Sequence, residues 1–257
     1  MTNRRQANNS IRPWAVVFWL LVWQGGSMAL SAAYPHGHLL LASPVSALVR
    51  LGELALTAAF WRTVFSSASH IFGGFLLSCA LGVILAAAAA KWRLLRELLS
   101  PLVAVVKAVP VVSFIILALV WLRAESLSLV IAALMVLPVV WGNLARGIRA
   151  TDPQLLEMVR AYRFSKVKVV RLVYLPSLRP YFSSALTTSM GLAWKSGAAA
   201  EVLALPKWGI GSEIYHAKLA IETPDLFAWT VVVVALSLML EWALGLCLER
   251  WKGGDSL

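Results

Sequence analysis

Charged residues are scarce in this sequence. Asp, Glu, Lys and Arg make up only 14% of the 257 residues, whereas soluble domains carry about 25%. The mean hydropathy is +0.78. Acidic residues are the rarer kind, with 12 Asp and Glu against 23 Lys and Arg. So little polar surface excludes an ordinary soluble domain, and the composition predicts a membrane protein.

Cysteine and clustered metal ligands are also scarce. Cys79 and Cys247 lie in apolar stretches, which is typical of small buried hydrophobic residues and excludes a disulfide framework. His36 and His38 form a short pair in a loop, but tight metal binding needs further ligands. We therefore expect no metal site.

Signatures of catalysis are missing as well. The sequence has no phosphate-binding loop of the form G-x-x-x-x-G-K-[ST] and no recognisable Ser-His-Asp arrangement. We predict no catalytic residues and no cofactor in this chain, which is not expected to hydrolyse ATP by itself.

Six apolar stretches are long enough to cross a bilayer, which takes about 20 apolar residues. Basic residues precede the first, as in a signal sequence, but its long Trp-rich core and poor cleavage sites favour a retained span. The sequence therefore predicts an all-α membrane protein with six transmembrane helices, at about residues 13–33, 61–90, 98–122, 126–146, 181–200 and 226–248.

The distribution of positive charge predicts the orientation. Loops on the membrane's inner side carry an excess of Lys and Arg. With the N-terminus inside, the inner loops hold Arg4, Arg5, Arg12, Lys91, Arg93, Arg96, Arg146, Arg149, Arg160, Arg163, Lys166, Lys168, Arg171, Arg179, Arg250 and Lys252. The outer loops hold only Arg50, Arg62, Arg123, Lys207 and Lys218. Both termini are therefore predicted to be cytoplasmic. Because the basic residues lie in the short loops between apolar spans, the net charge of +11 reflects membrane orientation and not a nucleic-acid partner.

The remaining segments predict one membrane domain. We expect cytoplasmic tails at 1–12 and 253–257 around a single domain at 13–252. An outer loop at 34–60 contains a short interfacial helix, which Ser43 can cap and Pro44 can begin. A second outer loop at 201–225 contains Trp208, Gly209 and Gly211.

The most polar segment is an inner loop at about 147–176. Thr151 or Asp152 can cap a short amphipathic helix that begins near Pro153. A second short helix is expected from 167 to 175, ending at Pro176. Two such helices beneath a bundle predict a rigid projection that transmits movement.

This loop resembles the EAA loop of permease subunits of bacterial ABC importers. In that pattern Glu-Ala-Ala is followed by three residues, a glycine, a spacer and Leu-Pro. Glu157, Met158 and Val159 take the first three places, and Leu175-Pro176 fall at the expected distance. Arg163 stands at the glycine position. Because arginine does not readily adopt a positive φ, we expect this turn to differ or the helices to join more smoothly.

The resemblance extends over most of the chain. The segments that carry it are Gly73-Gly74-Phe75 with Gly82, Pro101 and Pro110 in the third span, WKSGAAAE at 194–201, and Gly209-Ile210-Gly211. They are similar to permeases of the nitrate, sulfonate and taurine branch.

The resemblance implies a type I importer fold and a set of partners. A second permease copy completes the pathway as a homodimer, two P-loop ATPase subunits bind ATP and magnesium, and an extracytoplasmic solute-binding protein delivers substrate. The coupling helix spans about 151–164. The residues implied to contact the ATPase are Glu157, Met158, Val159, Arg160, Ala161 and Arg163. The alternative for Glu157 is an ion pair with Arg160 across one helix turn.

Two lysines lie inside apolar spans, where a charge normally faces the bundle interior or a wet cavity. Lys107 precedes Pro110, where a broken helix can line a pathway. Lys195 follows Trp194 and precedes Glu201. We predict these five residues as pathway candidates. Snorkelling of either lysine, or a structural Lys195–Glu201 pair, remains the alternative.

Three functions remain open from the sequence. The favoured one is transport of a small anion such as a sulfonate, taurine or nitrate. A permease for a thiamine-precursor pyrimidine is the main rival. A non-transport membrane scaffold, whose basic loop binds lipid or another partner, is the third.

Overall fold

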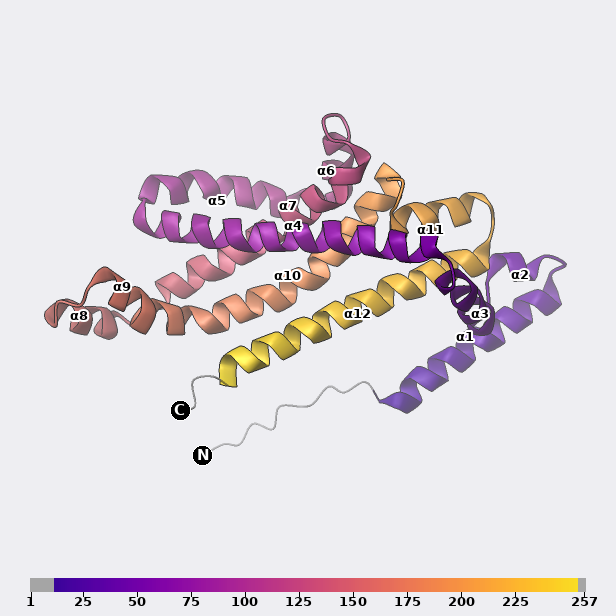
Figure 1. The fold of residues 1–257 in the computed structure, drawn as a ribbon, viewed down its shortest axis with the longest axis horizontal. Helices are drawn as coiled ribbons and strands as arrows, with labels where there is room; N and C mark the ends of the chain where they lie inside the picture. The colour runs from indigo at the N-terminus through magenta and orange to yellow at the C-terminus, as the bar shows by residue number, and fades with distance from the viewer. Residues whose placement is uncertain (1–11, 254–257) are drawn as a thin grey trace.

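The computed structural model describes residues 12–253, which contain helices and no strand (Figure 1). The predicted tails lie outside this range except for Arg12 and Gly253. The helices are α1 Pro13–Ala33, α2 Gly37–Leu40, α3 Pro44–Ala55, α4 Ala58–Lys91, α5 Arg93–Ala108, α6 Val111–Ala118, α7 Ala124–Arg149, α8 Pro153–Ala161, α9 Lys166–Val169, the π-helix η1 Val170–Tyr174, α10 Leu175–Ala204, α11 Ile210–Leu219 and α12 Thr223–Gly253.

The core of the bundle is α7, which packs along both α4 and α10. Small residues on α4 let the backbones approach closely. A Cβ on Gly74 would lie 2.3 Å from the carbonyl oxygen of Leu129, and one on Gly82 would lie 2.7 Å from Cγ1 of Val140. The Ser78 hydroxyl donates to the carbonyl of Ala133. Small residues and interhelical hydrogen bonds are the usual means of association between membrane helices.

The all-helical membrane architecture is confirmed, but the count of six spans is not. Within residues 12–253, four helices are long and apolar enough to cross a bilayer: α1, α4, α7 and α12. The bent pair α5–α6 makes five if it counts as one span. With 30 residues at about 1.5 Å each, α10 is long enough. Its polar residues, including Lys195 and Glu201, keep it below the apolar requirement.

The third predicted span, 98–122, is not one straight helix. The chain bends by 103° between α5 and α6. Pro110 explains the break, because a residue before proline is driven toward extended backbone, and Val109 has φ −81° and ψ 134°. Pro101, by contrast, stays inside α5.

The N-terminal helix α1 lies at the periphery. Ser27 is its only buried residue, and its main neighbours are α2 and α3. The helix predicted in the 34–60 loop is confirmed as α3, where the Ser43 hydroxyl accepts a 3.0 Å hydrogen bond from the Ser46 amide and Pro44 takes the first turn. The 201–225 loop contains a helix that the sequence did not predict, α11.

Candidate functional site

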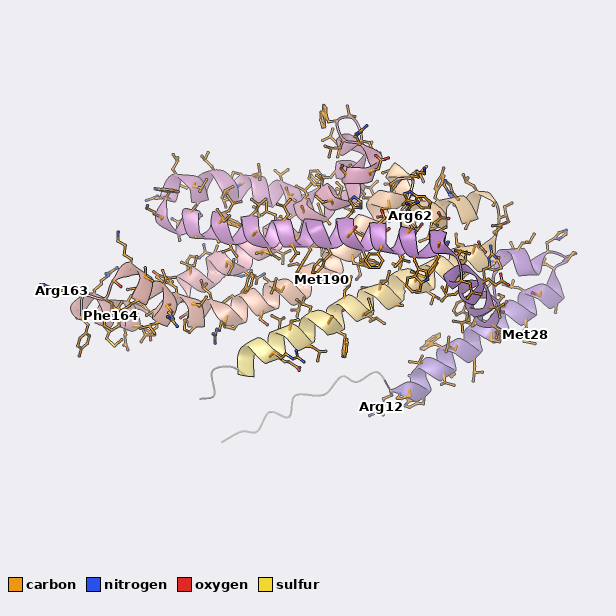
Figure 2. The ribbon with its side chains drawn as sticks, in the orientation of Figure 1. Arg12, Met28, Arg62, Arg163, Phe164 and Met190 are labelled. Atoms are coloured by element: carbon orange, nitrogen blue, oxygen red, sulfur yellow. The ribbon has the colours of Figure 1, made fainter. Side chains whose placement is uncertain are left out.

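The inner loop forms a projection at the end of the bundle opposite α1–α3 (Figure 1). It consists of α8, α9 and η1. Asp152 begins α8 as predicted, because its carboxylate accepts a 2.8 Å hydrogen bond from the Gln154 amide. Thr151 is buried instead and donates to the Gly147 carbonyl at 3.2 Å. Figure 2 shows Arg163 and Phe164 at the tip of this projection.

The turn after α8 corrects our expectation for Arg163. Arg163 adopts φ 52°, the left-handed conformation that glycine normally supplies. The Phe164 amide donates to the Val159 carbonyl and the Arg163 amide to the Arg160 carbonyl, each at 3.0 Å. This is the Schellman pattern of helix termination. The tight turn is therefore kept, and arginine replaces glycine without removing it.

Arg163→Gly is expected to stabilise the loop. A non-glycine residue in the left-handed region costs about 1–2 kcal/mol, although glycine returns part of this through the entropy of the unfolded chain. The thermal midpoint of the purified permease should stay level or rise. Arg160→Gly, within α8, is the matched control and should lower it. A clear fall for Arg163→Gly would show that the guanidinium makes a contact worth more than the strain.

The second short helix does not end at Pro176 as predicted. It continues through η1 into α10, and Leu175 and Tyr174 both keep right-handed helical backbone. Proline lacks the amide that would bond four residues back. The wider π turn immediately before Pro176 accommodates this loss without ending the helix.

An exposed apolar stripe runs along α8. Leu155 and Met158 are 40% and 44% exposed, and Tyr162, at the end of the helix, is 73% exposed. Their spacing of three and four residues places them on one face. Val159, by contrast, is buried, at 3% exposure. A large apolar stripe on a projecting helix is typical of a protein-docking surface.

Charged side chains lie on the other exposed sides of α8 and in the turn after it. Glu157, Arg160 and Arg163 are exposed, as is Ala161. Within residues 12–253, Glu157 forms no ion pair, so the pairing with Arg160 that we considered is not observed. Behind α8, a pocket of about 680 Å³ is lined by Arg160, Arg163, Lys166 and apolar residues. The projection thus offers both apolar and charged contacts.

The pathway candidates on α10 point in different directions. Trp194 is buried, and its Nε1 donates to the Val233 carbonyl on α12 at 2.9 Å. Lys195 is exposed. It lies on the same face as Ser184, Thr187 and Thr188, which are also exposed. Sequence reasoning missed this polar stripe, although its helical spacing was the signal.

The candidates of the broken span lie close to α7. Lys107 is exposed in the last turn of α5. Its Nζ lies 3.7 Å from where a Cβ on Gly142 would stand. Pro110 is exposed at the bend. The break and the lysine therefore lie together, beside the central helix.

Glu201 is buried, at 2% exposure, near the C-terminal end of α10. Its Oε2 accepts hydrogen bonds from the Ser67 hydroxyl at 2.7 Å and the Gly211 amide at 3.2 Å. The alternative Lys195–Glu201 pair is not observed among residues 12–253. Whether Glu201 or Trp194 also meets substrate stays a prediction.

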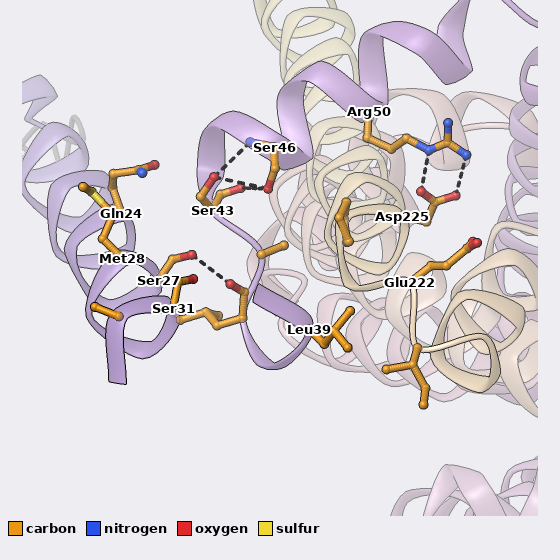
Figure 3. Close-up of a pocket in the computed structure, with 15 residues that line it drawn as sticks. Gln24, Ser27, Met28, Ser31, Leu39, Ser43, Ser46, Arg50, Glu222 and Asp225 are labelled. Atoms are coloured by element: carbon orange, nitrogen blue, oxygen red, sulfur yellow. Dashed lines mark hydrogen bonds and ion pairs between the residues drawn. The ribbon is translucent and has the colours of Figure 1, made fainter. Parts of the chain in front are cut away.

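A pocket of about 1060 Å³ opens at the end of the bundle that carries α3 (Figure 3). It lies between α1, α3 and the start of α12. Arg50 on α3 bonds Asp225 at 2.5 Å and 3.1 Å and Glu53 at 2.8 Å. These bonds raise the pKa of Arg50. This network fastens α3 to α12.

Comparison with known proteins identifies the family. Residues 78–251, more than half of the chain, match the family described as binding-protein-dependent transport system inner membrane component. The chain belongs to this family. Its members are membrane subunits of ABC transporters, and ATP is hydrolysed on partner subunits.

Named relatives of this permease cover most of its length. The riboflavin transport system permease protein RibX of Chloroflexus aurantiacus is 28% identical over 93% of this chain and 89% of its own. The putative aliphatic sulfonates transport permease protein SsuC of Bacillus subtilis is 25% identical over 86% and 79%. The bicarbonate transport system permease protein CmpB of Synechococcus elongatus is 26% identical over 75% and 69%.

Solved structures show the same fold. A chain of an amino acid ABC transporter crystallised with histidines has a TM-score of 0.62 and 16% identity, covering 79% of this permease and 96% of that chain. A chain of the inward-facing MetNI methionine transporter has a TM-score of 0.57 and 17% identity, covering 74% and 93%. The predicted resemblance to ABC importer permeases is confirmed, and so is the prediction that the chain is a multi-pass membrane protein.

Proposed function

We propose that this permease forms the substrate pathway of an ATP-driven importer with a second copy of itself, and that α8 couples the pathway to the ATPase. The observation that carries this proposal is the stripe of Leu155, Met158 and Tyr162 on a projecting helix. Nothing among the described residues covers it. A helix with an exposed apolar stripe and charged residues on its other sides, on a capped projection, suits a groove in a soluble ATPase.

The distribution of charge supports the orientation. The basic residues around α8, together with Lys91, Arg93 and Arg96, support a cytoplasmic location for this end of the bundle. We infer that α3 and α11 face outward, where a solute-binding protein delivers substrate, and that both termini are cytoplasmic. ATP and magnesium belong to the ATPase.

We infer that the substrate is a small anion. Lys195 and Lys107 are exposed at membrane depth, and a charge there is costly unless water or a counter-charge compensates it. The relative named for sulfonates and the one named for bicarbonate favour an anion. The relative named for riboflavin favours the second candidate, an aromatic vitamin. This candidate is of the same kind as the thiamine-precursor pyrimidine that the sequence left open. A non-transport scaffold is not supported by the family.

Co-purification with the ATPase tests the coupling proposal. The permease should retain a P-loop ATPase in detergent, and Met158→Asp should lose most of it, because a carboxylate in an apolar contact is costly to desolvate. Leu172→Asp, at an exposed apolar residue outside α8, is the matched control. Equal retention by both variants would remove α8 from the contact.

A further inference from the structure

The outer helix α11 is fastened to the bundle by side chains of other helices. Its own N-cap, Gly209, has no side chain, so the first amides of α11 need acceptors from elsewhere. Ser67 on α4 accepts from the Ile210 amide at 2.8 Å. Glu201 on α10 accepts from the Gly211 amide. A carboxylate at a helix N-terminus is also favoured by the helix dipole.

The same carboxylate meets two more helices. Ser67 on α4 donates its hydroxyl to Glu201, and Ser128 on α7 lines the same small pocket as Glu201. Glu201 thus bonds both α4 and α11 to α10, beside α7. All three polar residues are at most 2% exposed. Hydrogen bonds that water cannot reach are expensive to break without replacement.

Backbone packing closes the same junction. A Cβ on Gly211 would lie 2.5 Å from the Val202 amide nitrogen and 2.7 Å from the Ala198 carbonyl oxygen. These are main-chain atoms, which cannot move aside as a flexible side chain can. One turn before Glu201 on α10, a Cβ on Gly197 would lie 2.6 Å from Cγ1 of Ile71 on α4. The helices therefore have little freedom to slide here.

We propose that Glu201 is a positioning residue, which fastens α11 to α4 and α10 so that their outer ends move as one body during transport. The proposal rests on the importer function. It assigns Glu201 a role through hydrogen bonding rather than through charge on the substrate. Opening toward the outside then occurs between permease copies, and not by α11 lifting from its own bundle.

Distance measurements between spin labels test the rigid junction. Phe65 on α4 and Leu219 on α11 are 74% and 62% exposed. Both are replaced by Cys in a background that carries Cys79→Ala and Cys247→Ser, since these are the native cysteines. The complex with its ATPase is compared without nucleotide and after trapping with ATP and vanadate. An excess of unlabelled permease restricts the signal to one copy.

The distance from 65 to 219 should stay the same in both states. A shift larger than roughly one helical turn, about 5 Å, would overturn the proposal. Protein labelled at Leu219 alone reports the distance between two copies, and this should change on trapping. If the distance between copies does not change, the proposed importer function is contradicted. The rigid junction is tested separately, by the distance from 65 to 219 within one copy.

Substitutions then separate hydrogen bonding from charge. Glu201→Gln keeps an oxygen acceptor for Ser67 and Gly211, and its amide can meet Ser128. It should keep at least half of the ATPase activity and a narrow distance distribution. Glu201→Ala should broaden the distribution and lose most activity. Equal damage from both would show that charge is what matters, and would overturn the proposal.

Ser67→Ala provides a milder test if Glu201→Ala does not assemble. It removes one acceptor from α11 and should broaden the distance distribution partly. Ser69→Ala is the matched control, because Ser69 is exposed and, among the described residues, its hydroxyl bonds only the Ser66 carbonyl. A Ser67→Ala distribution as narrow as that of Ser69→Ala would overturn the proposal.

Discussion

Glu157→Lys is expected to leave the permease in the membrane and to abolish its coupling to the ATPase. Glu157 is exposed on α8 and pairs with no basic residue among those described, so its replacement removes no internal contact. Glu157 is on the same short helix as the apolar stripe that we assign to docking, but on a different side of it. A groove that encloses α8 meets this side too, and reversing the charge opposite a basic partner residue places like charges together, which costs several kcal/mol.

The measurement is ATPase stimulation in proteoliposomes that contain both subunits. A loss of at least about ten-fold is expected, corresponding to about 1.4 kcal/mol or more. Glu249→Lys, another exposed acidic residue, on α12, serves as the control and should stimulate normally. Normal stimulation by Glu157→Lys would take this residue out of the docking surface and leave the contact to the apolar stripe.

Lys195→Ala is expected to reduce uptake of an anionic substrate by at least about ten-fold while leaving assembly and basal ATPase activity unchanged. Lys195 is exposed on α10 beside a stripe of hydroxyl side chains and has no carboxylate partner among the described residues. A charge that serves packing would, on removal, change protein level. A charge that attracts an anion changes flux instead.

Uptake of the anion that the solute-binding protein delivers is the measurement. Lys195→Arg should keep more flux than Lys195→Ala, because it retains the charge but not the ammonium geometry. Lys207→Ala, in the outer loop, is the control for a lysine outside the spans. Normal uptake by Lys195→Ala would favour an uncharged substrate, as the relative named for riboflavin does.

Several elements of this protein follow from local physics and were predicted correctly. The apolar runs predicted α1, α4, α7 and α12, since hydropathy over about 20 residues dominates membrane insertion. Ser43 and Asp152 cap α3 and α8 as expected, because capping depends on a few neighbouring residues. The EAA-like loop predicted the family before any relative was compared.

Other features depend on contacts that no local pattern reveals. The loop predicted for 201–225 contains α11, whose first amides find their acceptors on α4 and α10. Arg163 adopts the conformation expected of glycine because the amides of this turn bond to carbonyls of α8, which favours the strained conformation. From the sequence, Glu201 is a candidate for lining the pathway. The fold shows that its carboxylate is buried and accepts hydrogen bonds from Ser67 and Gly211.

The sequence by itself determined a basic, multi-span helical membrane protein, and it predicts a cytoplasmic coupling loop. Composition, hydropathy and capping depend on residues that are close together in the sequence, so they can be evaluated from this sequence alone. Only the tertiary structure decided which polar residues face outward and which join helices. On α10, Lys195 and Glu201 are six residues apart, but one is exposed and the other buried. That difference is set by where α4, α7 and α11 pack, which no spacing along a single helix specifies.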